Sequence, residues 1–170
     1  IVRSASGILF MVMMAFASTC GSLTSNLIGR GHSDKVPGLI RQHTRLAYLF
    51  VLPLAILFAV FPHLILGIYT DMPDLREAAI PSLWVMCTTY LVLVPANVYF
   101  QSVSGTGNTR TALVLELSSL TIYTAYITWI ILFLRLDVAL CWSADIVYAI
   151  FILLFCWLYI RRGKWVGRQI

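Results

Sequence analysis

The feature that most constrains this sequence is a series of long apolar runs separated by short polar connections. The runs lie at about 5–28, 46–69, 82–104, 111–134 and 142–160. A bilayer core about 30 Å thick is crossed by about 20 mostly apolar residues in a helix. Backbone groups cannot stay unpaired in lipid, and the alternation of barrel strands is missing from the runs. We therefore predict an all-α membrane protein, a polytopic bundle with five transmembrane helices.

Composition supports a membrane protein and argues against other classes. Of the 170 residues, 60% are hydrophobic and 11% are charged. In soluble domains about 45–50% of the residues are apolar and about 25% are charged. The net charge of +5 does not indicate a nucleic-acid partner, because the basic residues gather at the ends of apolar runs. The four cysteines are scattered, without C-x-x-C or zinc spacing. We expect no cofactor, and the lipid bilayer as the surrounding partner.

The basic residues also predict the orientation of the chain. One set of connections holds nine of the twelve Lys and Arg residues: Arg30, Lys35, Arg41, Arg45, Arg110, Arg161, Arg162, Lys164 and Arg168. The positive-inside rule places that set in the cytoplasm. The tail at 161–170 is then cytoplasmic and the first residue lies outside. Five spans beginning outside suit a six-span unit without its first helix, so we expect a longer protein whose further part is N-terminal.

Two glycine-containing segments are predicted to be turns. Gly29 and Gly31 end the first helix, in which Ala15, Ser18, Ser22, Ser25 and Gly29 form a stripe of small residues suited to close helix packing. "GTGNTR", with Gly105 and Gly107, is a tight cytoplasmic turn capped by Asn108 or Thr109. A phosphate-binding loop would need a preceding strand and a G-K-[ST] ending, which this segment lacks.

Glu116 is the main candidate for a functional residue. It follows Arg110 by six residues inside an apolar run, and intramembrane acids are functional hypotheses by default. Ser119, Tyr123 and Tyr126 recur at spacings of three and four, on one stripe with the glutamate. A carboxylate with hydroxyls and aromatic rings suits Na⁺, H⁺ or a cationic guest. A structural glutamate bonded to a neighbouring helix is the alternative.

The third run carries a second set of candidates. Tyr90, Asn97, Gln101 and Ser104 lie on roughly one face, beside Pro95. Proline removes a helical hydrogen bond and frees a carbonyl one turn back. The pattern indicates either the wall of a transport cavity or a polar clamp between helices.

Three segments resemble the multidrug and toxic compound extrusion (MATE) transporters. "TSNLIGRGHSDKV" resembles the loop after the second helix of a lobe, "FQSVSGTGNTRTAL" the turn after the fourth helix, and "RRGKWVGRQI" a bacterial C-terminus. The resemblance implies helices eight to twelve of a twelve-helix, two-lobed protein in the bacterial inner membrane. It also implies an antiporter, not an enzyme, which exchanges Na⁺ or H⁺ for amphipathic organic cations by alternating access.

One departure from the family is important. Some members have an essential aspartate on the helix that matches the third run, but no acid occurs here between Glu77 and Glu116. That cation site cannot be transferred to this chain. The alternatives are that Glu116 replaces it or that the coupling acid lies in the N-terminal part.

Three other functions are the alternatives to antiport. A lipid-linked oligosaccharide flippase of the same superfamily would need Lys or Arg deep in the runs to bind pyrophosphate. A membrane enzyme would need convergent His, Asp and Glu residues. A non-catalytic membrane scaffold would not explain the polar stripes around Asn97 and Tyr123.

Overall fold

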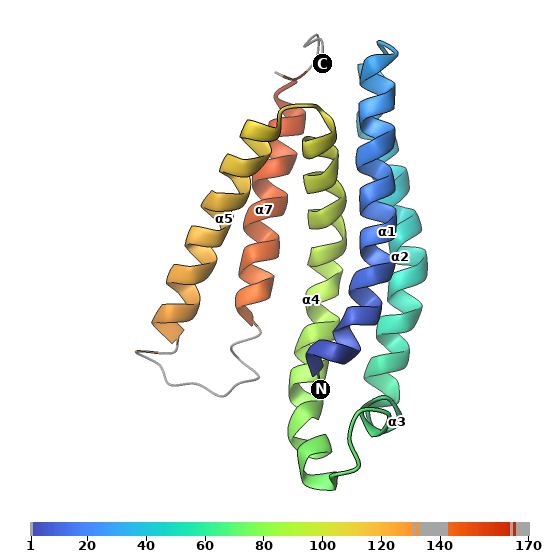
Figure 1. Ribbon diagram of the computed structural model, residues 1–170, viewed down its shortest axis with the longest axis vertical. Helices are drawn as coiled ribbons and strands as arrows, with labels where there is room; N and C mark the ends of the chain where they lie inside the picture. The colour runs from blue at the N-terminus through green and yellow to red at the C-terminus, as the bar shows by residue number, and fades with distance from the viewer. Residues whose placement is uncertain (1, 131, 133–142, 164, 166–170) are drawn as a thin grey trace.

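The computed structural model describes residues 2–130, 132, 143–163 and 165, and within them it contains helices and no strand (Figure 1). This confirms the all-α prediction. The elements in chain order are α1 (Val2–Gly29), η1 (Ser33–Lys35), α2 (Val36–Val60), α3 (Pro62–Gly67), α4 (Pro73–Gly105), α5 (Thr109–Trp129) and α7 (Ser143–Arg161). The predicted helix ends within 133–142, and the tail residues 164 and 166–170, lie outside the described residues.

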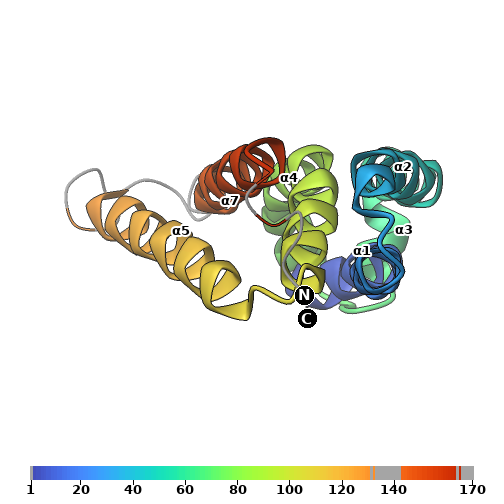
Figure 2. The same ribbon diagram turned by 90° about the horizontal axis from the view of Figure 1, so that it is seen from above.

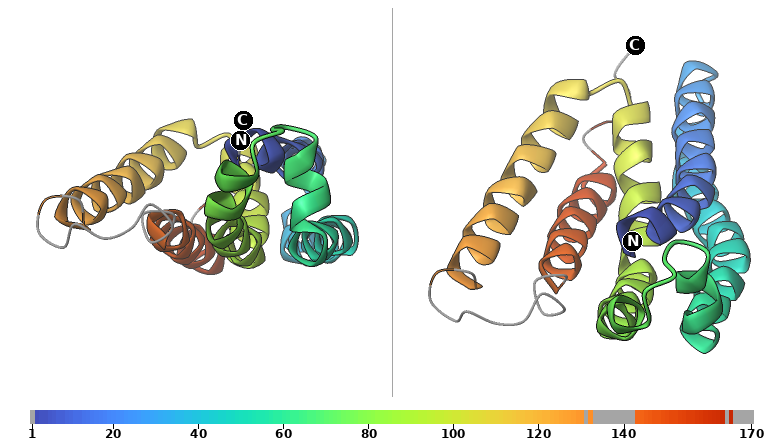
Figure 3. Two further views of the ribbon diagram at one scale, coloured as in Figure 1. Left: turned by 90° about the horizontal axis from the view of Figure 1, so that it is seen from below. Right: turned by 60° about the horizontal axis from the view of Figure 1, so that its bottom comes forward.

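Helix α4 is the centre of the bundle. It contacts α1 and α2 on one side and α7 on the other. Seen from above, α7 follows α4 and α5 forms the far edge (Figure 2). Helix α5 packs mainly on α7 and touches α4 only slightly, so it stands apart from α1 and α2 in both further views (Figure 3). The edge position of α5 matters because this helix carries Glu116.

Four of the described helices are long and apolar enough to cross a membrane. They are Ser6–Gly29, Ser33–Val60, Pro73–Gly105 and Ser143–Arg161. Helix α5 is not among them, although the sequence predicted a span there. Its 21 residues include Arg110, Glu116 and seven Ser or Thr residues, which lower its hydropathy. The chain is nevertheless a multi-pass membrane protein by its other helices.

The second helix differs from its prediction at both ends. The predicted span at 46–69 starts ten residues earlier, at Val36, and stops at Val60. The early part was expected to be a loop because it is basic, yet Pro37 sits in the first turn, where proline is tolerated. Pro62 then starts the separate short helix α3. Val36 and Ile40 are fully buried, so packing holds this first part in place.

The two predicted glycine turns are confirmed. At the end of α1, the His32 N–H donates to the Leu27 carbonyl oxygen at 2.8 Å and Gly31 has a φ of 75°. This is a Schellman-type ending, which requires a left-handed residue. Between α4 and α5, Gly107 has a φ of 77°, and the Asn108 side chain accepts from the Thr111 N–H at 3.3 Å. Asn108 is therefore the N-cap of α5.

Helices α1 and α4 approach closely through small residues. A Cβ atom on Gly105 would lie 2.3 Å from the Gly21 carbonyl oxygen. The Ser25 hydroxyl donates to the Gly105 carbonyl oxygen at 2.7 Å, and the Cys20 sulfur lies 3.2 Å from the Ser102 hydroxyl. Small residues thus allow the two backbones to touch.

The contact face of α1 is not the stripe expected from the sequence. Ala15, Ser18, Ser22 and Gly29 are exposed in the described structure, and only Ser25 of that stripe bonds to α4. The buried positions are instead Ala17, Cys20, Gly21 and Thr24. The backbone of α4 at Gly105 selects this face, because Gly21 offers it no side chain.

The proline in the middle of α4 has a partner on another helix. Pro95 cannot donate to the carbonyl of Leu91, four residues earlier. The Tyr48 hydroxyl of α2 donates to that carbonyl oxygen. The group freed by the proline is therefore used to join α2 and α4 rather than left open.

Candidate functional site

Glu116 lies at the contact between α5 and α7. It is seven residues, or about 10 Å along the axis, from Thr109 at the start of α5. The Tyr148 hydroxyl of α7 donates to Glu116 Oε1 at 2.8 Å. The glutamate is only partly exposed in the described structure. A charge-assisted hydrogen bond of this kind is about twice as strong as a neutral one.

The second carboxylate oxygen has a different environment. Glu116 Oε2 is buried and has no hydrogen-bond partner among the described residues. An unpaired buried polar atom loses water without compensation, at about 1–3 kcal/mol and more for a charged group. The carboxylate is thus held by one oxygen and left chemically unsatisfied at the other.

Aromatic and apolar side chains pack beside the Glu116–Tyr148 hydrogen bond. The ring of Tyr123 meets that of Tyr148 edge to face, with centroids 6.2 Å apart. Ala112, Ala149 and Cys156 are buried in the same hydrophobic cluster.

The other predicted residues of α5 have separate positions. Ser119 is fully buried, and its hydroxyl donates to the Leu115 carbonyl oxygen of its own helix at 2.9 Å. Tyr126 is partly buried one turn after Tyr123. The predicted stripe is thus brought against α7, not against open space. The structural alternative for Glu116 was a bond to a neighbouring helix, and the bond from Tyr148 is such a bond. The same contact is also where a functional role of Glu116 would have to act.

The predicted residues of α4 lie apart from Glu116. The Tyr90 hydroxyl donates to the Ser6 carbonyl oxygen of α1 at 2.9 Å, and this tyrosine is 5% exposed. The Asn97 side chain donates to the Leu93 carbonyl oxygen of its own helix at 3.0 Å. Gln101 is partly buried beside Gly21 of α1. Tyr90 is a clamp between α1 and α4, which is the structural alternative considered for this run.

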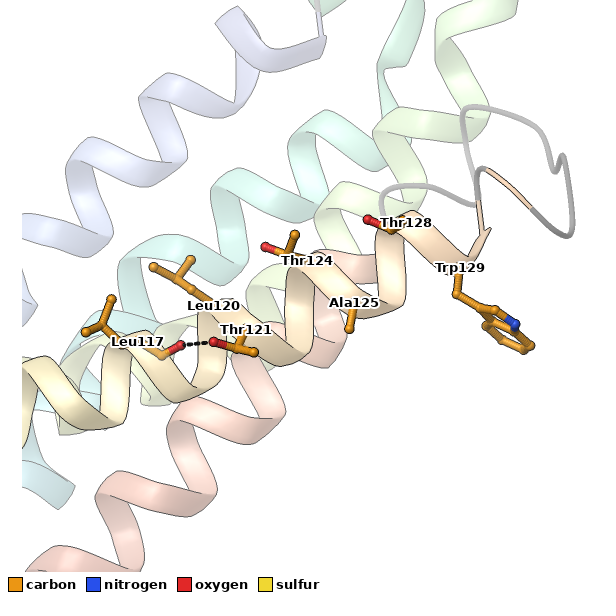
Figure 4. A pocket seen from close by; sticks show the side chains of 7 residues that line it. All are labelled: Leu117, Leu120, Thr121, Thr124, Ala125, Thr128 and Trp129. Carbon is orange, nitrogen blue, oxygen red and sulfur yellow. Dashed lines mark hydrogen bonds between the residues drawn. The ribbon is translucent and has the colours of Figure 1, made fainter.

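The opposite, outer face of α5 is an open surface. It presents Leu117, Leu120, Thr121, Thr124, Ala125, Thr128 and Trp129. All seven come from this one helix (Figure 4). The Thr121 hydroxyl donates to the Leu117 carbonyl oxygen at 2.8 Å. None of these seven residues is an acid, so the face of α5 that carries Glu116 and this open face are different.

The sequence reasoning missed Tyr148. This residue lies in an apolar run and is 32 positions from Glu116, so no spacing connects the two. The available signal was a phenol in the middle of a predicted span, where a buried hydroxyl needs a partner. The described residues contain no group of three or more His, Cys, Asp or Glu side chains able to hold a metal ion.

Comparison with known proteins gives the family. A family model, MatE, matches residues 1–130. The chain belongs to the MatE family. Its members are transporters, so a membrane transport function follows at the level of the family. The searches of curated proteins and of solved structures found no match.

Only part of the candidate site of this MatE protein lies within the residues that match the family model. They include α1 to α5 and therefore Glu116, whereas α7 with Tyr148 lies beyond them. The carboxylate lies within the matched residues, and its hydrogen-bond donor, Tyr148, comes from α7. Both segments are needed to build the site.

Proposed function

We propose that this chain is the C-terminal lobe, helices eight to twelve, of a two-lobed MatE antiporter in the bacterial inner membrane. The antiporter exports amphipathic organic cations in exchange for Na⁺ or H⁺ by alternating access. The family match supports transport, and the four apolar helices support the membrane location. The tail lies in the cytoplasm, because the exposed basic residues Arg30, Arg41, Arg110 and Arg161 belong to the end that the positive-inside rule assigns there.

Glu116 is the coupling carboxylate in this proposal. The observation that carries the assignment is its divided environment, with Oε1 bonded to Tyr148 and Oε2 buried without a partner. A charge near the middle of a membrane costs at least about 2.5–3.5 kcal/mol. A cation that neutralises Glu116 removes that penalty, so its binding changes the relative stability of the two access states.

The edge position of α5 supports a role in movement. Helix α5 packs mainly on α7, and only Ala112 and Ser119 of its described helical residues are buried. An element with few buried contacts rearranges at lower free energy than a central helix such as α4. The Glu116–Tyr148 bond is one of the ties that would change with the bound cation.

The test is efflux of ethidium from proteoliposomes that contain the full-length transporter, under imposed sodium and proton gradients. Wild type is expected to export ethidium with at least one gradient, and Glu116→Gln to lose gradient-driven export. Glu77→Gln is the matched control, because Glu77 is an exposed acid in the first turns of α4. Equal export by wild type and Glu116→Gln, at equal protein levels, contradicts the assignment of Glu116.

A further inference from the structure

The first turns of α2 combine a buried apolar face with an exposed basic one. Val36, Ile40 and Ala47 are fully buried in the core. Arg41 and Arg45 are exposed. They are four residues apart, so they lie one above the other on the same side of the helix. These two arginines, the α2 basic pair, therefore form one positive patch on the outer surface of the bundle.

The exposed side of α2 becomes apolar directly after the α2 basic pair. Leu49, Ile56 and Val60 are all exposed in the described structure. At 3.6 residues per turn, Leu49 and Ile56 lie within about 40° of Arg45 around the helix axis. One stripe of α2 therefore has a basic part followed by an apolar part, which is the pattern of a helix that leaves the hydrocarbon of a membrane.

The other end of α2 indicates where the membrane ends on that side. The Trp84 indole N–H of α4 donates to the Ala59 carbonyl oxygen at 3.2 Å, and this tryptophan is exposed. Tryptophan collects at membrane–water interfaces, where the ring meets lipid and the N–H meets polar groups. The last residues of α2, which ends at Val60, are therefore expected at one interface.

The length of α2 then places the basic pair at the opposite interface. From Leu46 to Val60 the helix rises about 22 Å, whereas the hydrocarbon core is about 30 Å thick. The remaining distance of about 8 Å corresponds to about five residues, which is the segment from Arg41 to Arg45. Arginine side chains in this position extend along the helix toward the lipid headgroups.

The same end of the bundle carries an excess of positive charge. The end of α1, the α4–α5 turn and the end of α7 lie together at the top of Figure 1. The exposed basic residues at or near this end are Arg30, Lys35, Arg41, Arg45, Arg110, Arg161 and Arg162. Asp34 is the single acid among the described residues of these helix ends. Such an end attracts anionic groups and repels cationic ones.

We propose that Arg41 and Arg45 bind the headgroup of an acidic phospholipid whose acyl chains lie along Leu49 and Ile56. The planar guanidinium group donates two parallel hydrogen bonds to a phosphate. A zwitterionic headgroup also carries a phosphate, but its ammonium group meets the positive end of the bundle. Free phosphate offers the same oxygens without contact to the apolar part of the stripe. The inference needs the membrane location of the chain and not the antiport function proposed above.

The first experiment identifies the ligand. Purified full-length protein in a neutral detergent is titrated with phosphatidylglycerol or with phosphatidylethanolamine of the same acyl chains, and native mass spectrometry counts the bound lipids. Wild type is expected to bind phosphatidylglycerol more tightly and to keep it when inorganic phosphate is added. Equal binding of the two lipids, or displacement by inorganic phosphate, would overturn the proposal. A stripe covered by another part of the full-length chain would give no preference and would overturn it as well.

The second experiment locates the site with two double variants of equal charge. Arg41→Gln/Arg45→Gln removes the α2 basic pair, whereas Arg30→Gln/Lys35→Gln removes two charges from the segment before α2. A basic residue near a membrane surface contributes about fivefold in affinity, so the first variant is expected to bind phosphatidylglycerol about 25-fold more weakly. The second is expected to lose less than about fivefold. Equal losses would show a diffuse attraction to the whole end and would contradict a site on α2.

A third variant separates the guanidinium groups from their charge. Arg41→Lys/Arg45→Lys keeps both charges but lacks the planar pair of donors, so it is expected to recover only part of the binding. Full recovery would overturn the assignment of a guanidinium–phosphate contact. Size-exclusion profiles and circular dichroism confirm that each variant is folded.

The lipid site and the antiport function fail in different ways. If wild type binds phosphatidylglycerol with the expected preference but does not export ethidium or another organic cation, the antiport function fails and the lipid site stands. If wild type exports ethidium and shows no preference for phosphatidylglycerol, the lipid site fails and the antiport function stands.

Discussion

The close contact between α1 and α4 yields a graded prediction for glycine substitutions. In Gly105→Ala the new Cβ would meet the Gly21 carbonyl oxygen at 2.3 Å, a backbone atom that no side-chain rotation moves away. In Gly21→Ala the nearest atom is the Gln101 carbonyl oxygen at 2.8 Å. In Gly29→Ala the Cβ has nothing within 4 Å. The three variants therefore make the same chemical change with decreasing steric conflict.

The magnitude follows from two losses at Gly105. Forcing an extra carbon into a packed contact costs about 1–3 kcal/mol. Moving the helices apart also breaks the bond from the Ser25 hydroxyl to the Gly105 carbonyl oxygen, and such bonds in membranes contribute about 0.6–1.7 kcal/mol. The helix-forming gain of alanine is small, because Gly105 is the last residue of α4. The net destabilisation is about 2–5 kcal/mol, or about 30- to 5,000-fold in the unfolding equilibrium.

The assay is unfolding of the detergent-purified protein, followed by far-UV circular dichroism during titration with a denaturing detergent and during heating. The expected order of stability is Gly29→Ala at or slightly above wild type, then Gly21→Ala, then Gly105→Ala. A Gly105→Ala variant as stable as Gly29→Ala would refute the contact between the two backbones. A loss in Gly29→Ala equal to that in Gly105→Ala would show a general intolerance of alanine instead.

Further predictions concern single hydrogen bonds. Tyr90→Phe removes the bond to the Ser6 carbonyl oxygen and is expected to lower unfolding stability by about 1 kcal/mol, with export of ethidium retained; loss of export at normal stability would instead place Tyr90 in the transport path. Asn108→Ala removes the N-cap of α5 and the bond to Tyr159, with an expected loss of about 1–2 kcal/mol. Asn108→Asp keeps the cap acceptor and is expected to recover part of that stability in the same denaturation assay; no recovery would show that the cap is unimportant.

The sequence by itself determined the class of this protein and the positions of two of its turns. Runs of about twenty apolar residues require helices in a membrane, because only a helix satisfies its own backbone groups there. Gly31 and Gly107 marked the turns, because left-handed backbone favours glycine. Glu116 stood out because an acid in an apolar run is costly. These are local or compositional constraints, so they can be read without knowing which helices meet.

The tertiary structure decided which faces and which partners are used. Periodicity groups Glu116, Ser119 and Tyr123 on one stripe, but the position of α7 turned that stripe into a helix contact and supplied Tyr148. Likewise, the carbonyl freed by Pro95 was expected, whereas its partner Tyr48 comes from another helix. A repeat of three and four residues determines which side chains share one face of a helix. Only the packing of a second helix against that face determines which residues those side chains contact.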